Sequence, residues 1–271
     1  MKKFVYILLL AITLSSCSEY QKALKSEDLK TKVDMATKLF EAGKFSKAEK
    51  LFKQVIPKYR GKPQAERLMF MSAMSSYQME DYHISGYHFE RFTDGYPKSD
   101  KAEEAAFLSA KSYYMLSPVY SKEQGETIEA LEKLQLFINR YPDSEYLAET
   151  NKLINELDFK LEKKAFEIAK QYNKIAYFES SDYEAAIKAF DNFLIEFPGT
   201  SFREEAMFYR LDSSFKLAIN SIRNKKEQRL AIAMGYYNTF IKYYPNSERT
   251  DEVAKMNEEM QTQLQQFNTK S

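Results

Sequence analysis

The chain of 271 residues has no tryptophan, one cysteine, and only seven glycines and seven prolines. So few glycines and prolines argue against a loop-rich or all-β protein, and the scattered glycines form no phosphate-binding loop. His83 and His88 are five residues apart, so they cannot form the one-face pair that helical metal sites use. No grouping of residues suggests catalysis. The sequence therefore predicts a protein that is not an enzyme and that uses neither a metal nor another cofactor.

A bias toward one sign of charge is also lacking. The chain has 40 Lys and Arg against 39 Asp and Glu, and this balance argues against a nucleic-acid partner. After the N-terminal segment, no apolar run is long enough to cross a membrane. Aromatic residues, in contrast, are abundant, with 20 Tyr and 20 Phe. This composition indicates helices that pack through aromatic side chains.

The N-terminal segment combines a basic start, a short apolar run and the single cysteine. Lys2 and Lys3 precede an apolar run of 11 residues from Phe4 to Leu14, far fewer than the ~20 that a membrane-spanning helix needs. The tetrad Leu14-Ser15-Ser16-Cys17 resembles a bacterial lipobox. Residues 1–16 are therefore predicted to be a lipoprotein signal peptide, and Cys17 to carry acyl chains at the new N-terminus.

Lipidation at Cys17 determines the predicted location of the mature protein. The alternative is an ordinary secretory signal with an incidental cysteine, but a lone free thiol is a liability in an oxidising compartment. Two or three acyl chains hold a protein stably at a membrane. Ser18 rather than Asp follows the cysteine, which in lipoproteins of the enterobacterial type favours the outer membrane. We expect residues 17–27 to be a lipidated tether on the periplasmic side of the outer membrane.

The rest of the chain contains a pattern that recurs five times. Each copy has a small residue, a large residue four positions later, and an aromatic residue or Val seven positions later. The small residues are Ala48, Ser85, Ala130, Ala186 and Ala233, and the large ones are Phe52, Phe89, Leu134, Phe190 and Tyr237. This spacing is one face of a helix, and the small residue marks the close approach of another helix.

Four of the five copies end in an aromatic-proline pair that is followed by Ser or Thr. The pairs are Tyr96-Pro97, Tyr141-Pro142, Phe197-Pro198 and Tyr244-Pro245, whereas the first copy has Arg60 in place of proline. The Ser or Thr is expected to cap the next helix. The intervening stretches predict first helices over residues 28–41, 64–78, 100–115, 144–172 and 202–220. Insertions are expected between the helices at 117–125, 174–181 and 220–229.

This period resembles the tetratricopeptide repeat, in which one unit is one helical hairpin. We expect an all-α fold, a superhelical solenoid of about five tetratricopeptide-like helical hairpins plus a C-terminal helix. The repeat domain is expected to cover residues 28–271. Its units are expected near 28–60, 64–97, 100–142, 144–198 and 202–245, with the terminal helix over 248–267.

A lipobox followed by repeats with these closures resembles the BamD family, the lipoproteins of the outer-membrane β-barrel assembly machinery. The resemblance runs from Cys17 to the C-terminal helix and is most specific from Tyr113 to Ser144 and from Tyr183 to Pro198. It implies a lipid-tethered scaffold that binds the periplasmic part of a BamA-type insertase, other assembly subunits and unfolded outer-membrane proteins. Arg60 and the longer fourth and fifth units depart from the family pattern.

Stacked hairpins form a curved solenoid whose first helices line a concave face suited to an extended peptide. In the first three units, the groove-facing positions are counted from Ala36, Ala73 and Ala110. They hold Val33, Thr37 and Phe40, then Phe70, Met74 and Tyr77, then Phe107, Lys111 and Tyr114. Such a groove suits an aromatic-bearing segment of an unfolded barrel protein. The alternative, residue by residue, is that these aromatic side chains are buried between hairpins as core.

Two other classes of protein remain open. A lipid-anchored repeat protein of this kind can be a periplasmic adaptor for a cell-wall or polysaccharide enzyme, which binds folded partners through the same surfaces. It can also be a glycan-binding lipoprotein of an uptake system. The second class usually needs a longer chain and carbohydrate-stacking tryptophan, and this chain has no tryptophan.

Overall fold

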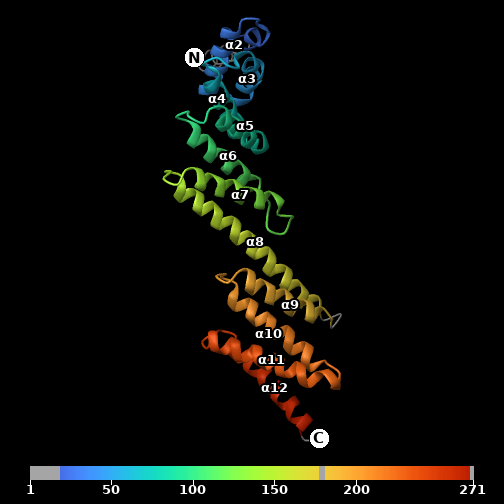
Figure 1. Cartoon of the computed structure of the whole chain (residues 1–271). Coiled ribbons are helices and arrows are strands. Elements are labelled where there is room, and N and C mark those ends of the chain that lie inside the picture. Colours follow the sequence, from blue (N-terminus) through green and yellow to red (C-terminus); the bar gives the residue numbers. More distant parts are fainter. Residues whose placement is uncertain (1–18, 177–180, 269–271) are drawn as a thin grey trace, which may run out of the picture. The chain divides into compact units, whose positions relative to one another are not determined.

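The computed structural model describes residues 19–176 and 181–268, and every regular element within these ranges is an α-helix (Figure 1). A short helix over residues 19–25 comes first. It is followed by α2 (Leu29–Glu41), α3 (Phe45–Tyr59), α4 (Ala65–Gln78), α5 (Tyr82–Gly95), α6 (Ala102–Leu116), α7 (Gly125–Arg140), α8 (Leu147–Ile175), α9 (Ser181–Glu196), α10 (Arg203–Ile219), α11 (Arg223–Tyr243) and α12 (Thr250–Asn268). The predicted all-α class is confirmed. The predicted signal peptide and Cys17 lie outside the described residues.

The helices alternate in the roles that the repeat pattern predicts. The first helices of the hairpins are α2, α4, α6, α8 and α10, and the second helices are α3, α5, α7, α9 and α11. Each helix from α2 to α6 packs against the next one along the chain, and so does each helix from α9 to α11. Apolar surface is therefore buried mainly between neighbours in sequence, as in other repeat arrays.

Within the predicted repeat domain the chain divides into two compact units. The first ends at Leu157 and the second begins at Asp158, so the boundary lies within α8. Each unit has apolar cores of its own. The first unit buries clusters around Phe52, Phe89 and Phe137. The second buries clusters around the aromatic side chains of α8 to α11.

The small residues of the repeat pattern lie at the helix contacts. Their exposed fraction is 0% at every one of the five positions, namely Ala48, Ser85, Ala130, Ala186 and Ala233. A small side chain at a contact lets the backbones of two helices come close. The large residues four positions later are also fully buried, except for the half-buried Tyr237. The predicted packing face of the second helices is thereby confirmed.

The aromatic-proline closures end three second helices with one shared geometry. Tyr96, Tyr141 and Tyr244 are the C-cap residues of α5, α7 and α11, with φ from −133° to −130° and ψ from 58° to 68°. A following proline excludes the helical conformation at these residues. Each C-cap N–H donates to the carbonyl of the Phe four residues earlier, and the two rings are 5.5–5.7 Å apart. The motif therefore combines a helix stop with aromatic packing.

The Ser or Thr after each proline acts differently from the predicted helix cap. Ser99, Ser144, Thr200 and Ser247 accept a hydrogen bond from the backbone N–H two residues later, at 3.0–3.1 Å. The N-cap of α6 is Lys101, which makes no side-chain capping bond. The hydroxyl therefore closes the turn that leads into the next helix, and it fixes the residue two positions later.

Two segments differ from the prediction. The expected tether over 17–27 contains the helix over residues 19–25, and Tyr20, at 6% exposed, joins the core of the first hairpin. The expected insertion over 220–229 is mostly helical, because α11 begins at Arg223. The insertion at 117–125 does form an irregular segment before α7. Part of the insertion expected at 174–181, namely residues 177–180, lies outside the described residues.

Adding bulk at a helix contact should destabilise the protein. We expect Ala233→Leu to lower the free energy of unfolding by about 1–3 kcal/mol, because Ala233 is fully buried and the extra carbon atoms must displace packed neighbours. The matched control is Ala231→Leu, which places the same side chain on the exposed side of α11. Urea denaturation of both variants measures the difference. Equal stabilities would contradict the packing role of Ala233.

Candidate functional site

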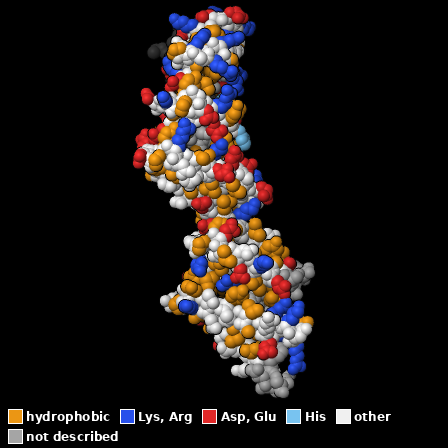
Figure 2. Space-filling view, in the orientation of Figure 1, with side chains coloured by type: hydrophobic (Ala, Val, Ile, Leu, Met, Phe, Trp, Pro, Cys, Tyr) orange, Lys and Arg blue, Asp and Glu red, His pale blue; other side chains and the backbone are white. Residues whose placement is uncertain are grey.

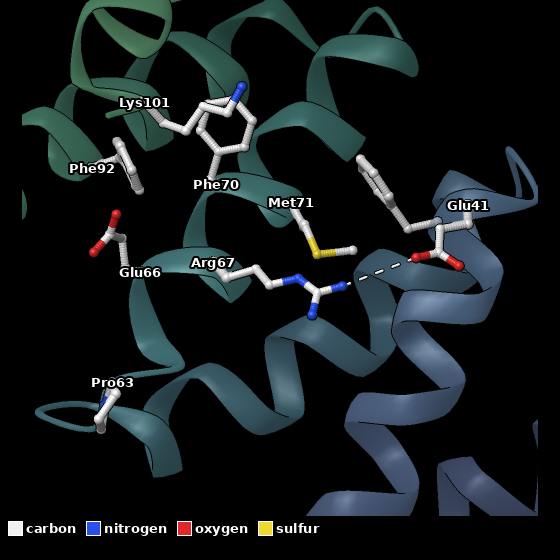
Figure 3. A pocket seen from close by; sticks show the side chains of 9 residues that line it. Glu41, Pro63, Glu66, Arg67, Phe70, Met71, Phe92 and Lys101 are labelled. Carbon is white, nitrogen blue, oxygen red and sulfur yellow. Dashed lines mark ion pairs between the residues drawn. The ribbon is translucent and has the colours of Figure 1, made fainter. Parts of the chain in front are cut away.

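A pocket of about 540 Å³ opens between the first helices α2 and α4, beside the turn that precedes α6 (Figure 3). It is lined by Phe40, Glu41, Pro63, Glu66, Arg67, Phe70, Met71, Phe92 and Lys101. Its volume falls within the range of about 300–1,000 Å³ that is typical of ligand pockets. Two of the predicted groove residues, Phe40 and Phe70, are therefore brought together here.

Aromatic side chains form the pocket wall and are held by the core behind them. Phe40 packs edge-on against Phe52, with ring centres 6.4 Å apart. Phe70 packs edge-on against Phe89 and Phe92, at 5.8 and 5.5 Å. Phe40 and Phe70 are both half-buried. Since edge-on contacts fix ring orientation, the exposed parts of these rings are preformed surfaces for an apolar ligand.

The turns at the ends of four hairpins each place one side chain on an aromatic ring. In four hairpins, the residue fixed by the Ser or Thr hydroxyl lies on an aromatic side chain of the same hairpin's first helix. The pairs are Lys101 on Phe70 at 5.6 Å, Tyr146 on Phe107 at 4.5 Å, Phe202 on Phe166 at 4.9 Å and Arg249 on Phe208 at 3.9 Å.

The planar side chains of Tyr, Phe and Arg cover their partner rings, whose exposed fractions are 1–3%. Lysine has no planar group and presents an ammonium group on a flexible aliphatic stem. Phe70 is half-buried, and the Lys101 ammonium lies 5.6 Å from the centre of its ring. The hairpin that contributes to this pocket is thus the one whose turn residue is a lysine.

The charged rim of the pocket is only partly neutralised. Arg67 reaches from α4 toward Glu41 on α2 (Figure 3), but the two charged groups are 4.0 Å apart and their side chains are 68% and 66% exposed. Such an ion pair contributes little, so the guanidinium remains available to a ligand. Lys101 pairs with Glu104 at 2.8 Å. Glu66 accepts a hydrogen bond from the Ser99 hydroxyl.

The other predicted groove residues lie farther along α4 and α6 and do not line this pocket. Met74 and Tyr77 are half-buried against the Phe89 cluster, where burial raises the pKa of Tyr77. The prediction that Phe107 faces the groove is wrong, because its side chain is 3% exposed and stacks on Tyr146. Its ring is part of the core. On α2, the half-buried residues Val33 and Thr37 occupy positions before Phe40.

Lys111 and Tyr114 connect α6 with the start of α8. The Lys111 ammonium lies 2.6 Å from the Glu149 carboxylate. The Tyr114 hydroxyl donates to Glu156, and this hydrogen bond raises the pKa of Tyr114 to about 12. The polar positions predicted for the groove are thus engaged with acids of the next first helix, so α6 contacts the start of α8 within the first unit.

Counting groove-facing positions from the small residues of the first helices did not find the charged pocket residues Glu41, Glu66, Arg67 and Lys101. Arg67 comes three residues before Phe70 on α4, so counting one more helical turn along the same face would have found it. Lys101 comes from the turn before α6. Only the spacing from Ser99, two residues earlier, could have indicated its position.

The second unit contains a pocket of about 530 Å³ formed by α9, α10 and α11. Asp191 accepts hydrogen bonds from Arg210 at 2.7 Å and from the Tyr236 hydroxyl at 3.4 Å. The Arg210 guanidinium lies 4.3 Å from the centre of the Tyr236 ring, and Arg229 pairs with Glu184. Two ion pairs, Arg210 with Asp191 and Arg229 with Glu184, therefore lie at this pocket, although the buried Nε of Arg210 has no hydrogen-bond partner.

Neither a metal site nor a membrane span is found in the part of the chain that the structure describes. No group of three or more His, Cys, Asp or Glu side chains in that part could hold a metal ion. None of its helices is long and apolar enough to cross a bilayer. His83 is exposed and His88 is half-buried, and burial lowers the pKa of His88.

The profile of the YfiO family, described as outer membrane lipoprotein, matches residues 30–176 and 174–269. The chain belongs to this family. The first matched segment contains the pocket between α2 and α4, and the second contains α9 to α12. Both compact units are thus part of the YfiO pattern.

Curated relatives of this YfiO-family chain are named outer membrane protein assembly factor BamD. The protein of Caulobacter vibrioides is 23% identical over 77% of this chain and 66% of its own length. A putative BamD of Aquifex aeolicus is 25% identical over 82% of this chain and 71% of its own. The protein of Rickettsia prowazekii is 22% identical over 78% of both chains. The chain thus spans about two thirds to four fifths of these relatives.

One solved structure is described as the TPR2AB-domain:pHSP90-complex of yeast Sti1. It aligns with 86% of this YfiO-family chain and 98% of its own chain, at 14% identity and a TM-score of 0.40.

Proposed function

We propose that this protein is a lipid-anchored scaffold for the assembly of outer-membrane β-barrel proteins, held on the periplasmic side through Cys17. Membership in a family of outer membrane lipoproteins and similarity to three proteins named assembly factors support the proposal. The serial hairpins support it physically, because they present long surfaces to extended chains. On this proposal the protein is not an enzyme.

The pocket between α2 and α4 is the proposed site for unfolded outer-membrane proteins. Its aromatic wall suits an apolar or aromatic side chain, and the exposed Arg67 suits a carboxylate, which guanidinium groups bind in a forked geometry. One extended segment that ends in an aromatic residue offers both groups. We therefore propose that the pocket binds the C-terminal end of a barrel protein before it folds.

A BamA-type insertase and other assembly subunits are the proposed folded partners. We assign their docking to the later hairpins, following the resemblance to BamD proteins. A pull-down from detergent-solubilised outer membranes distinguishes this role from that of an adaptor. Recovery of a barrel insertase supports assembly, whereas recovery of a wall hydrolase or synthase alone would replace the proposal with the adaptor role.

Removal of the proposed lipidation site should release the protein from membranes. We expect Cys17→Ala to move the protein from the membrane fraction to the soluble fraction or to leave an unprocessed precursor, because no other cysteine can carry acyl chains. Ser18→Ala is the matched control and should stay at the membrane. Fractionation and the intact mass of the mature N-terminus measure the result. An unmodified Cys17 in wild-type protein would disprove lipidation.

Arg67 should contribute to peptide affinity through the terminal carboxylate. We expect Arg67→Ala to weaken binding of a peptide with a C-terminal aromatic residue about tenfold, the usual size of one charge-assisted hydrogen bond. The amidated peptide should bind wild type and variant equally weakly. Arg140→Ala removes an exposed arginine from α7 and serves as control. If the variant loses the same affinity for both peptides, Arg67 does not bind the carboxylate.

A planar side chain in place of Lys101 should close the pocket. We expect Lys101→Tyr to cover Phe70, as Tyr146 covers Phe107, and to weaken peptide binding at least tenfold. The melting temperature should be unchanged or raised, because stacking buries more apolar surface. Lys101→Gln removes the charge without covering the ring and should lose less affinity. Undiminished binding by a folded Lys101→Tyr variant would place the peptide elsewhere.

A further inference from the structure

The balanced overall charge conceals one strongly basic segment. Between Lys44 and Lys62 the chain has seven basic residues and one acidic residue. The basic residues are Lys44, Lys47, Lys50, Lys53, Lys58, Arg60 and Lys62, and all seven are exposed. We call them the basic face of α3. Figure 2 shows Lys and Arg atoms over the α2 and α3 end of the first unit.

The helical period places the charges of α3 on its solvent side. The remaining exposed positions of this helix are Ser46, Gln54 and Pro57, so its exposed surface carries no acidic side chain. The one acid of the segment, Glu49, points inward, is 4% exposed and accepts a hydrogen bond from the Ser72 hydroxyl at 2.6 Å. Within its own helix the basic face is therefore neutralised only at Lys53, which pairs with Glu49.

Neighbouring elements do not neutralise it. In the described ranges, no carboxylate forms an ion pair with Lys44, Lys50, Lys58 or Arg60. Lys53 lies 3.7 Å from Glu49. Two further lysines lie over aromatic rings, Lys47 at 5.3 Å from Tyr20 and Lys62 at 4.9 Å from Tyr59. Most of the charge on this face is open to an external anion.

The basic face lies beside the N-terminal end of the described chain. Lys47 contacts the ring of Tyr20 in the helix over residues 19–25. Lys32 joins the same helix to α3, because its ammonium donates to the Leu24 carbonyl and to the Gln54 side chain. Cys17 comes two residues before Glu19, a reach of about 7 Å at most. Acyl chains on Cys17 would therefore hold this face close to the bilayer.

We propose that the basic face of α3 binds the anionic headgroups of the membrane in which Cys17 is anchored. The orientation at the membrane rests on the proposed lipidation, but the affinity of the face for anionic lipid does not. A cluster of four to eight Lys and Arg beside a membrane anchor binds anionic lipid electrostatically, and each charge changes the partitioning by about fivefold. Acyl chains and the basic face together would hold the first unit in one orientation at the surface.

The test uses the chain from Ser18 onward, which keeps every described residue and all of the buried cores. Co-sedimentation is measured with phosphatidylcholine vesicles that contain or lack phosphatidylglycerol. The wild-type chain should bind only the anionic vesicles and should dissociate at high salt, which screens charges. The triple variant Lys44→Gln, Lys50→Gln and Lys58→Gln should partition on the order of 100-fold less. These lysines are exposed and without ion pairs, so the melting temperature should not change.

The matched control removes three exposed charges from α11 in the second unit, through Arg223→Gln, Lys225→Gln and Lys242→Gln. Its binding should stay within about twofold of wild type. Equal losses in both triple variants, or equal binding to neutral vesicles, would overturn the assignment to α3. Absence of binding to the anionic vesicles at low salt would also overturn it. Because the assay needs neither acylation nor an insertase, its outcome is independent of the assembly role.

Discussion

The close approach of consecutive helices at small side chains is the constraint on which the rest of this structure depends. A single hairpin cannot bury its apolar face alone, so each one is stabilised by the hairpins beside it. The fully buried alanines and Ser85 bring the helices together, and large side chains such as Phe89 then fill the space between them. The first helices are consequently held in series, and the pocket between α2 and α4 follows from that arrangement.

Features that depend on spacing within one helix could be predicted from the sequence. The small and large positions of the second helices and the turns after proline recur at fixed intervals, and the structure has them where the intervals place them. The same count treated Phe70 and Phe107 as equivalent, yet only Phe70 keeps an exposed face. The difference comes from Lys101 and Tyr146, about 30 to 40 residues later. Spacing within a helix holds no information about a side chain that arrives from a distant turn.

The net charge of the chain likewise does not predict the charge of its individual surfaces. Nearly equal numbers of acidic and basic residues indicated no preferred partner, but the segment from Lys44 to Lys62 is basic and the second helix α7 carries three acids in its first half. An electrostatic field acts over about one Debye length, roughly 10 Å. A partner at the surface therefore responds to the local arrangement, such as the inward-pointing Glu49 among outward-pointing lysines, and not to the sum over the chain.

In four hairpins the closing turn affects the exposure of one aromatic ring, whereas the packing between helices depends mainly on other residues. The residue fixed by the Ser or Thr hydroxyl rests on a ring of its own hairpin, while the fully buried small residues of the second helices lie at the helix contacts. A substitution in that turn can thus expose or cover one ring and leave the rest of the array as it was. Specificity in a chain built this way can diverge one hairpin at a time, and uncovering a ring gives up the stability of its stacking contact.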